Sequence, residues 1–193
     1  MTAGPSPAAP IFTAGHSTRS LEDLVGLLQG AGVEALVDVR RYPSSRRHPH
    51  FNRKPLADAL EAAGMAYRHS EILGGRREPA APDSPNTAWS SEGFRAYADH
   101  LATPEARSAL EALAAGAGNR RICLMCAEKD PERCHRQLLA DALSLRGIPV
   151  RHLVEPDRAM DHAPHAAATL TAEGVVIYPA GTASQGDLFD SGA

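Results

Sequence analysis

Residues 121–147 place an apolar run, a polar turn and an amphipathic segment in succession, and this order constrains the fold more than any other stretch. Ile122–Cys126 is apolar throughout, which predicts a strand buried on both faces. Asp130 and Pro131 favour an N-cap and a first helical position, so a helix is predicted from residue 131 until Gly147 stops it. Such a strand–turn–helix unit presents the side chains of its turn at the carboxyl end of a sheet.

The turn between this strand and this helix contains two thiols, a carboxylate, an imidazole and two guanidinium groups. A turn that only connects two elements has little use for such a set, so we expect it to take part in function. These side chains belong to Cys126, Glu128, Arg133, Cys134, His135 and Arg136.

Alternating strand and helix patterns on both sides of this unit predict a single α/β domain over residues 11–154. We expect a mostly parallel central sheet of about five strands with helices on both faces. Residues 1–10 form a Pro- and Ala-rich leader that is expected to be disordered, and residues 155–193 form an extension in which Val175–Tyr178 is a candidate short strand. The predicted strands are 11–15, 33–39, 65–69, 122–126 and 150–154, and the predicted helices are 21–29, 55–63, a segment around Trp89 to Tyr97, 104–115 and 131–146.

Composition limits the class of protein. A net charge of -3 excludes a molecule that binds nucleic acid through its overall charge. Three cysteines, an odd number, do not form the disulfide framework of a secreted domain. The first ten residues lack the apolar core of a signal peptide, and no segment is long enough to cross a membrane. We therefore expect a cytoplasmic protein with reduced thiols and no membrane partner.

Four predicted segments end in polar or glycine residues at the same edge of the sheet. His16, Asp38, Arg40, Gly74–Gly75 and Cys126 all follow or end predicted strands, or lie just beyond one. Ligands of open α/β sheets bind beyond the carboxyl ends of the strands. The sequence therefore predicts one site at this edge.

With these residues identified, the chain resembles the family catalogued as domain of unknown function 488 (DUF488). The resemblance implies an α/β domain over residues 11–154 and supplies neither an activity nor catalytic residues. The stretches that carry it are Thr13–Ser20, Leu36–Arg47, Phe51–Asn52, Leu73–Arg76 and, most specifically, Leu124–Arg136.

Cys126 is the candidate nucleophile of this site. It precedes the predicted helix and lies near Arg133 and His135 in sequence, and both a helix N-terminus and cationic neighbours lower the pKa of a thiol. The alternative is a buried cysteine that packs as a small hydrophobic residue. The segment Leu36–Arg40 also resembles a strand of rhodanese-type sulfurtransferases, which leaves a sulfur-transfer enzyme as another alternative. Proton transfer in the catalytic reading is assigned to Asp38, Glu128 or His16.

Metal binding is a second alternative for the same cysteine, although no cofactor is predicted. Cys126, Cys134 and His135, or His16, could supply ligands, but the chain lacks the paired short ligand spacing of recognisable zinc sites. Residues 134 and 135 would point about 100° apart on the predicted helix. We therefore expect that Cys134 and His135 do not both face Cys126.

An anion site is predicted beside Cys126. Arginines from three segments meet a helix N-terminus at this edge, which is the chemistry that binds phosphate groups. The alternative is a solvated basic loop that pairs with Asp38, Glu71 and Glu128. The predicted anion-binding residues are Arg40, Arg46, Arg47, Arg76, Arg133 and Arg136.

The last predicted feature is a short peptide in the extension. Gln185, Asp187, Leu188 and Phe189 resemble the motif by which bacterial replication and repair proteins hold the sliding clamp, with Gly186 in place of the usual Leu. An apolar pair in a polar tail is typical of a peptide that enters a hydrophobic groove. The alternative is a tail that folds back on its own domain.

The sequence thus favours a protein that binds or processes a nucleotide or nucleic acid in DNA replication or repair, through an arginine-rich site beside a reactive cysteine. One alternative is a non-catalytic, clamp-associated adaptor that binds nucleic acid. The other is a rhodanese-like thiol or sulfur-transfer enzyme.

Overall fold

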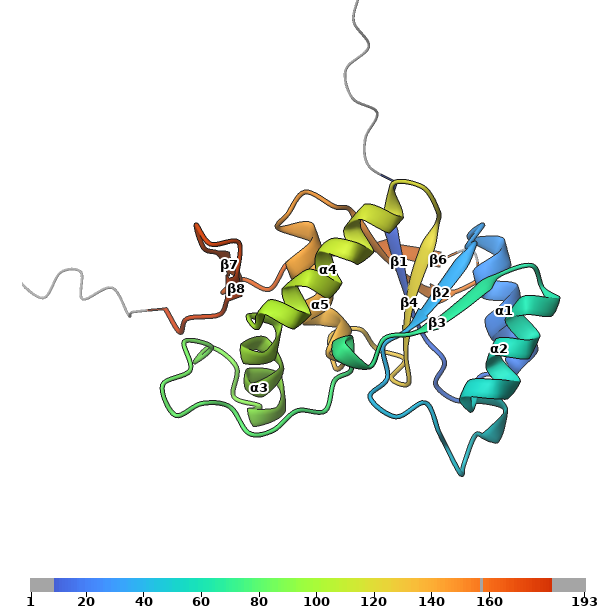
Figure 1. Cartoon of the computed structure of the whole chain (residues 1–193), viewed down its shortest axis with the longest axis horizontal. Helices are drawn as coiled ribbons and strands as arrows, with labels where there is room; N and C mark the ends of the chain where they lie inside the picture. Colours follow the sequence, from blue (N-terminus) through green and yellow to red (C-terminus); the bar gives the residue numbers. More distant parts are fainter. Residues whose placement is uncertain (1–8, 157, 182–193) are drawn as a thin grey trace, which may run out of the picture.

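A six-stranded sheet forms the centre of the protein in the computed structural model, which describes residues 9–156 and 158–181. The strand order is β3-β2-β4-β1-β5-β6, in which the first five strands are parallel and β6 is antiparallel to β5. This arrangement confirms the predicted α/β fold (Figure 1). The strands are β1 (Ile11–Gly15), β2 (Ala35–Asp38), β3 (Ala66–His69), β4 (Ile122–Cys126), β5 (Val150–Glu155) and β6 (Arg158–Asp161), and a separate two-stranded ribbon joins β7 (Thr169–Leu170) to β8 (Val176–Ile177).

In the described residues, five α-helices cover both faces of the sheet, as predicted. In Figure 1, α1 and α2 lie on one side, and α4 and α5 lie on the other with α3 next to them. None of the helices in the described part of the chain combines the length and the apolar character that a membrane crossing needs. The helices are α1 (Leu21–Gly30), α2 (Arg53–Ala62), α3 (Glu92–Leu101), α4 (Pro104–Ala117) and α5 (Arg136–Ser144), and single 3-10 turns form η1 (Pro49–Phe51) and η2 (Glu71–Leu73).

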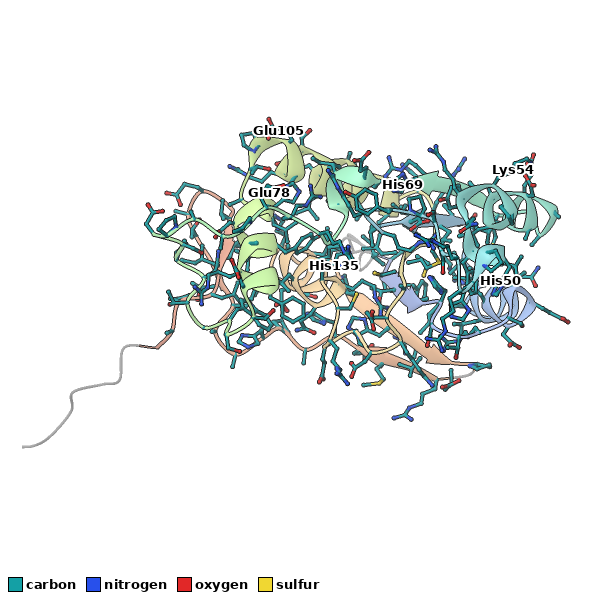
Figure 2. The ribbon with its side chains drawn as sticks, turned by 90° about the horizontal axis from the view of Figure 1, so that it is seen from below. His50, Lys54, His69, Glu78, Glu105 and His135 are labelled. Carbon is teal, nitrogen blue, oxygen red and sulfur yellow. The ribbon has the colours of Figure 1, made fainter. Side chains whose placement is uncertain are left out.

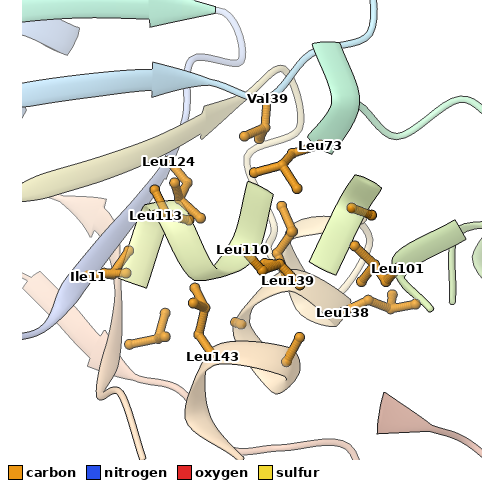
Figure 3. Packing of buried hydrophobic residues seen from close by; sticks show 14 of the residues in the cluster. Ile11, Val39, Leu73, Leu101, Leu110, Leu113, Leu124, Leu138, Leu139 and Leu143 are labelled. Carbon is orange, nitrogen blue, oxygen red and sulfur yellow. The ribbon is translucent and has the colours of Figure 1, made fainter. Parts of the chain in front are cut away.

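The central strand β4 contributes to two hydrophobic cores, one on each face of the sheet. Leu124 packs with the apolar side chains of α4 and α5, such as Leu113 and Leu139 (Figure 3). Met125 packs on the opposite face with Leu24 of α1. Because successive residues of a strand point to opposite faces, a strand between two cores must be apolar at every position. This explains the continuous apolar run of the sequence.

Two helix starts agree with their sequence signals, and two do not. Helices α1 and α4 begin where the sequence predicts, at residues 21 and 104, because Ser20 and Asp23 form a capping box for α1 and Thr103 caps α4. Helix α2 begins at Arg53, two residues before Pro55. Helix α5 begins at Arg136 rather than at residue 131, so the prediction for this helix is wrong by five residues.

The late start of α5 has a local reason. The Asp130 carboxylate accepts a hydrogen bond from the Glu132 N–H, so it closes a turn instead of capping the helix. The Cys134 N–H then donates to the Pro131 carbonyl, which continues the turn by one further step. An acidic residue before proline stabilises a turn as well as it stabilises a helix start, so the local signal does not distinguish the two.

The sixth strand lies in the segment that the sequence pattern left unassigned. β6 pairs with β5, and Val176 and Tyr178 from the same extension are buried in the core of the α4–α5 face. The strand is short and its side chains are mostly exposed, so residues 158–161 contain no alternation that would predict it. The segment around Val175–Tyr178 does form a short strand, β8.

A buried chain of hydrogen bonds holds this extension against α5. Thr13 Oγ1 is 2.7 Å from His152 Nδ1, His152 Nε2 is 3.0 Å from His162 Nδ1, and His162 Nε2 is 2.7 Å from Asp141 Oδ1. With both rings neutral, each histidine donates through Nε2 in the direction of Asp141 and accepts through Nδ1. Tyr178 also donates to Asp141 at 2.8 Å. The direction of the whole chain therefore requires an unprotonated His152 Nδ1.

This row of hydrogen bonds predicts that His152 makes the free energy of unfolding depend on pH. Burial, followed by the charges of His162 and Arg136, lowers the pKa of His152 from 6.5 to about 4. Because the folded pKa is below the unfolded value, the unfolded chain binds more protons between about pH 6.5 and 4, and stability falls as the pH falls through this range. The free energy of unfolding should therefore decrease less between about pH 6.5 and 4 in His152→Gln than in the original protein. We expect the difference to be about 1–3 kcal/mol, measured by urea unfolding at several pH values. Identical pH profiles for the variant and the original protein would contradict this assignment.

Candidate functional site

A cavity of about 900 Å³ opens beyond the carboxyl ends of the parallel strands. His16 and Ser17 follow β1, Cys126 ends β4, and the long loop after β2 forms another wall. Figure 2 shows His135, which also lines the cavity, near the middle of the molecule. The further lining segments are Arg40–Tyr42, Ser44–Ser45, Arg47–His48, Gly75–Arg77, Ser91, Gly93–Phe94, Ala127–Glu128 and Arg133–Cys134.

Arginine dominates the charged lining of this cavity. Six of the described lining residues are arginines, and only Glu128 among them carries a carboxylate. Four of the six were predicted from the sequence, namely Arg40, Arg47, Arg76 and Arg133. The other two are Arg41 and Arg77. Each directly follows a predicted arginine in the chain, so the two Arg-Arg pairs in the sequence could have indicated these residues.

Two predicted anion-binding arginines lie elsewhere. Arg46 is exposed on the loop after β2 and is not among the lining residues. Arg136 is buried, with 1% of its surface exposed. Its guanidinium group donates to the carbonyls of Glu128 and Lys129, to Thr13 Oγ1 and to Cys134 Sγ. It therefore shapes the turn after β4 and does not face the cavity.

Asp38 lies beneath the cavity and holds Arg40. Its carboxylate is fully buried and accepts from Arg40 Nε at 2.9 Å and from Arg40 Nη2 at 2.6 Å. Tyr67 donates to the same carboxylate at 2.9 Å, and Arg40 also donates to the Phe51 carbonyl. These bonds fix the Arg40 side chain in one position, which is the geometry of a strong two-pronged ion pair. Asp38 faces Arg40 and does not line the cavity.

His16 completes this part of the wall as a neutral ring. Its Nδ1 donates to the Ser17 carbonyl at 3.0 Å, so Nε2 is free to accept from Arg40 Nη1 at 3.4 Å. The ring stacks on Phe51 with centroids 4.2 Å apart. Burial, with a further effect of the Arg40 charge, lowers the pKa of His16 to about 4. The Nε2 lone pair is therefore directed at Arg40 at neutral pH.

The floor of the cavity is formed by Cys126, Cys134 and His135. His135 Nδ1 is 3.7 Å from both sulfur atoms. The expectation that Cys134 and His135 could not both face Cys126 is therefore wrong. It assumed helical geometry at these positions, whereas Cys134 lies in the turn before α5 and His135 is the residue that precedes its first turn.

The two floor sulfur atoms differ in their affinity for a proton. The hydrogen bond with Cys134, followed by burial, raises the pKa of Cys126 well above 9.0. The same hydrogen bond, with help from His135 and Arg136, lowers the pKa of Cys134 well below 9.0. The sequence interpretation assigned the lowered pKa to Cys126, and the structure assigns it to Cys134, because its sulfur takes part in the hydrogen bond with Cys126 and Arg136 Nε also donates to it at 3.4 Å. Burial alone raises the pKa of Cys123, on the opposite face, to about 12.

His135 has a defined orientation. Its Nε2 is 3.0 Å from the Val39 carbonyl, which can only accept, so Nε2 carries the proton. This leaves Nδ1 directed at the two sulfur atoms. Space for this ring depends on Gly75, where an added Cβ would lie 2.4 Å from His135 Nδ1.

Comparison with known protein families shows a match over most of the domain. The family model described as "Domain of unknown function DUF488" matches residues 20–143, which extend from the cap of α1 into α5. The match includes Asp38, the cavity arginines and the three floor residues, and it leaves out His16. No curated protein and no solved structure matches the chain.

The close approach at Gly75 gives a test of this geometry. We expect Gly75→Ala to lower the free energy of unfolding by about 1–3 kcal/mol, because the new methyl group displaces the His135 ring from its bond to Val39. Gly93→Ala is a matched control at another lining glycine, since its Cβ would meet only Ser91 Oγ at 3.8 Å. Urea unfolding measures both variants. Equal stability of Gly75→Ala and the original protein would show that the ring does not occupy this position.

Proposed function

The chain belongs to the DUF488 family of domains of unknown function, and we propose that its cavity binds the phosphate groups of a nucleotide or a nucleic acid. The observation that carries this proposal is the set of six arginines against one carboxylate around a cavity of about 900 Å³. Guanidinium groups bind phosphate oxygens with two parallel hydrogen bonds, and their charge persists at all physiological pH values. The volume lies within the range of pockets for molecules of nucleotide size.

Three of the arginines are placed to contact a ligand. Arg47, Arg76 and Arg133 come from three separate loops and have exposed side chains. Among the described residues, none of the three has a carboxylate within ion-pair distance. By contrast, Arg40 pairs with Asp38 and Arg41 pairs with Glu71. The first three therefore supply the ligand contacts, and the paired ones contribute mainly to the shape of the wall.

Aromatic side chains favour a ligand that also carries a base. Tyr42 lines the cavity with 64% of its surface exposed, and Phe94 lines the wall formed by α3. An exposed aromatic ring beside arginines is the combination that stacks on a nucleobase while its phosphate is bound. Free phosphate has no ring that could stack on Tyr42.

In the enzymatic form of this proposal, the arginines hold the phosphate and a reacting group of the ligand meets the floor. Cys126 is then the candidate nucleophile, and Glu128 on the same cavity is the candidate to take up its proton, because both ring nitrogens of His16 are already bonded, to Ser17 and to Arg40. In the non-catalytic form, an adaptor binds nucleic acid through the same arginines without turnover. A rhodanese-like sulfur-transfer enzyme uses the floor but does not require the nucleotide. Loss of nucleotide binding on removal of the arginines separates the first two forms from the third.

The arginine contacts predict a specific loss of binding. We expect Arg47→Ala/Arg76→Ala/Arg133→Ala to weaken binding of a fluorescein-labelled single-stranded oligonucleotide at least about tenfold, since hydrogen bonds to charged groups contribute about 1.5–3 kcal/mol each. Fluorescence polarisation at several salt concentrations measures the loss, and the slope of affinity against salt should become shallower. Competition by unlabelled mononucleotides distinguishes a nucleotide site from a nucleic-acid site.

Arg46→Ala is the matched control for this experiment. Arg46 is an exposed arginine of the same loop as Arg47, but it does not line the cavity. Its removal should leave the affinity nearly unchanged. An equal loss of binding in Arg46→Ala and in the triple variant would indicate attraction to surface charge instead of a cavity.

The proposed link to DNA replication and repair rests on the peptide Gln185–Phe189, which lies outside the described residues. Leu188 and Phe189 would each contribute about 1.5–3 kcal/mol if a groove of the sliding clamp enclosed them. Part of this free energy is offset by ordering of the peptide, so micromolar affinity is expected.

The test of this link is fluorescence polarisation of the labelled tail peptide with a bacterial sliding clamp. Leu188→Ala/Phe189→Ala should abolish binding, and the melting temperature of the full-length variant serves as the folding control. Absence of binding at about 50 µM, far above the expected dissociation constant, would remove the argument for a role in DNA repair.

A further inference from the structure

The geometry of the cavity floor points to a metal site: Cys126, Cys134 and His135 bind a zinc-type cation whose fourth coordination position faces the arginine-lined cavity. One ligand atom from each of these residues lies within 4.8 Å of the other two. All three residues line the cavity. The inference goes beyond phosphate binding, because it depends only on these three atoms and their surroundings.

The distances fit a tetrahedral ion. Zinc lies about 2.3 Å from a thiolate sulfur and about 2.0–2.1 Å from an imidazole nitrogen, which places sulfur and nitrogen about 3.6 Å apart at a tetrahedral angle. His135 Nδ1 is 3.7 Å from Cys126 Sγ and 3.7 Å from Cys134 Sγ. A single N–H or lone pair cannot form a good hydrogen bond with two sulfur atoms at once, whereas one ion between the three atoms satisfies all of them.

The surroundings of His135 prepare its Nδ1 as a ligand. Its Nε2–H donates to the Val39 carbonyl at 3.0 Å, which fixes the ring and leaves the lone pair on Nδ1. Metal-binding histidines commonly donate their other ring N–H to a backbone carbonyl in this way. Gly75 keeps the space beside Nδ1 open, because any Cβ there would lie 2.4 Å from this atom.

The two sulfur atoms are also supported as ligands. Arg136 Nε donates to Cys134 Sγ at 3.4 Å, which stabilises negative charge on that sulfur. Two thiolates and one neutral imidazole carry two negative charges, enough to balance a divalent cation at the base of an otherwise positive cavity. Soft sulfur ligands with one imidazole favour zinc over magnesium or calcium.

The number of ligands indicates the class of site. Among the described residues, no further histidine, cysteine or carboxylate supplies a fourth ligand to this group. Structural zinc sites are closed by four protein ligands, whereas catalytic sites have three and leave one position for water or a ligand oxygen. With the ion bound, both sulfur atoms are ligands, so this role excludes Cys126 as the nucleophile. The ion would then supply Lewis-acid activation to a phosphate-bearing ligand that the arginines hold.

The experiment uses the full-length protein without an affinity tag. Zinc is removed with a chelator, cobalt(II) is titrated under reducing conditions, and sulfur-to-cobalt charge-transfer absorption is recorded. We expect one cobalt per chain, displaced by one equivalent of zinc. Cys126→Ala, Cys134→Ala and His135→Ala should each weaken binding by more than the roughly 10–100-fold that loss of a supporting hydrogen bond costs.

Cys123→Ala is the matched control, because Cys123 is a buried cysteine of the same strand that packs on the opposite face. It should keep the charge-transfer band. Circular dichroism establishes that each variant is folded, and the titration of the original protein decides the matter even where a variant is not. No band in the original protein, or an equal band in all three ligand variants, would overturn the metal site.

Alkylation by iodoacetamide separates the two roles of the thiols. A bound ion should slow alkylation of Cys126 and Cys134 relative to the metal-free protein. Fast alkylation of Cys126 that zinc does not affect would overturn the metal site and favour the nucleophile. The triple arginine variant should still bind cobalt, and the metal-free original protein should still bind the oligonucleotide through its arginines, so failure of one proposal is distinguishable from failure of the other.

Discussion

The rest of this structure depends on the hydrogen bonds of the buried guanidinium group of Arg136. A buried charge is costly unless its hydrogen bonds are satisfied, so the surrounding chain must bring acceptors to it. The carbonyls of Glu128 and Lys129, the Thr13 hydroxyl and the Cys134 sulfur fill this role. These partners belong to β1 and to the turn after β4, so one side chain closes the turn and joins it to the neighbouring strand.

The same side chain links the cavity floor to the C-terminal extension. Thr13 accepts from Arg136 and donates to His152, which begins the chain of bonds to His162 and Asp141. A rearrangement of the floor that moves Arg136 would therefore alter the packing of the segment 158–178 against α5. The site and the extension are coupled by hydrogen bonds through His152 and His162, and protonation of His152 opposes this arrangement.

Arginines have two separate roles in this protein. Arg40 and Arg136 are buried and fully bonded to the protein, where they fix the shape of the wall and of the turn. Arg47, Arg76 and Arg133 are exposed around the cavity and are available to a ligand. Sequence spacing gave all of these residues one role, since a motif reports the residue type and not its exposure. Burial divides them, and burial is a property of the packed chain.

The amino-acid sequence by itself determined the α/β class, the parallel strands and the edge at which the chemistry gathers, because apolar periodicity and capping residues such as Ser20 act over a few neighbouring positions. It did not determine where α5 begins, because an Asp-Pro turn has the same local chemistry as a helix start. Only the tertiary structure decided that Cys134 and His135 both lie beside Cys126 and that Asp38 forms an ion pair with Arg40. It also decided that β6 extends the sheet. Each of these depends on partners distant in sequence, such as Val39 for His135, and such contacts exist only once the sheet has formed.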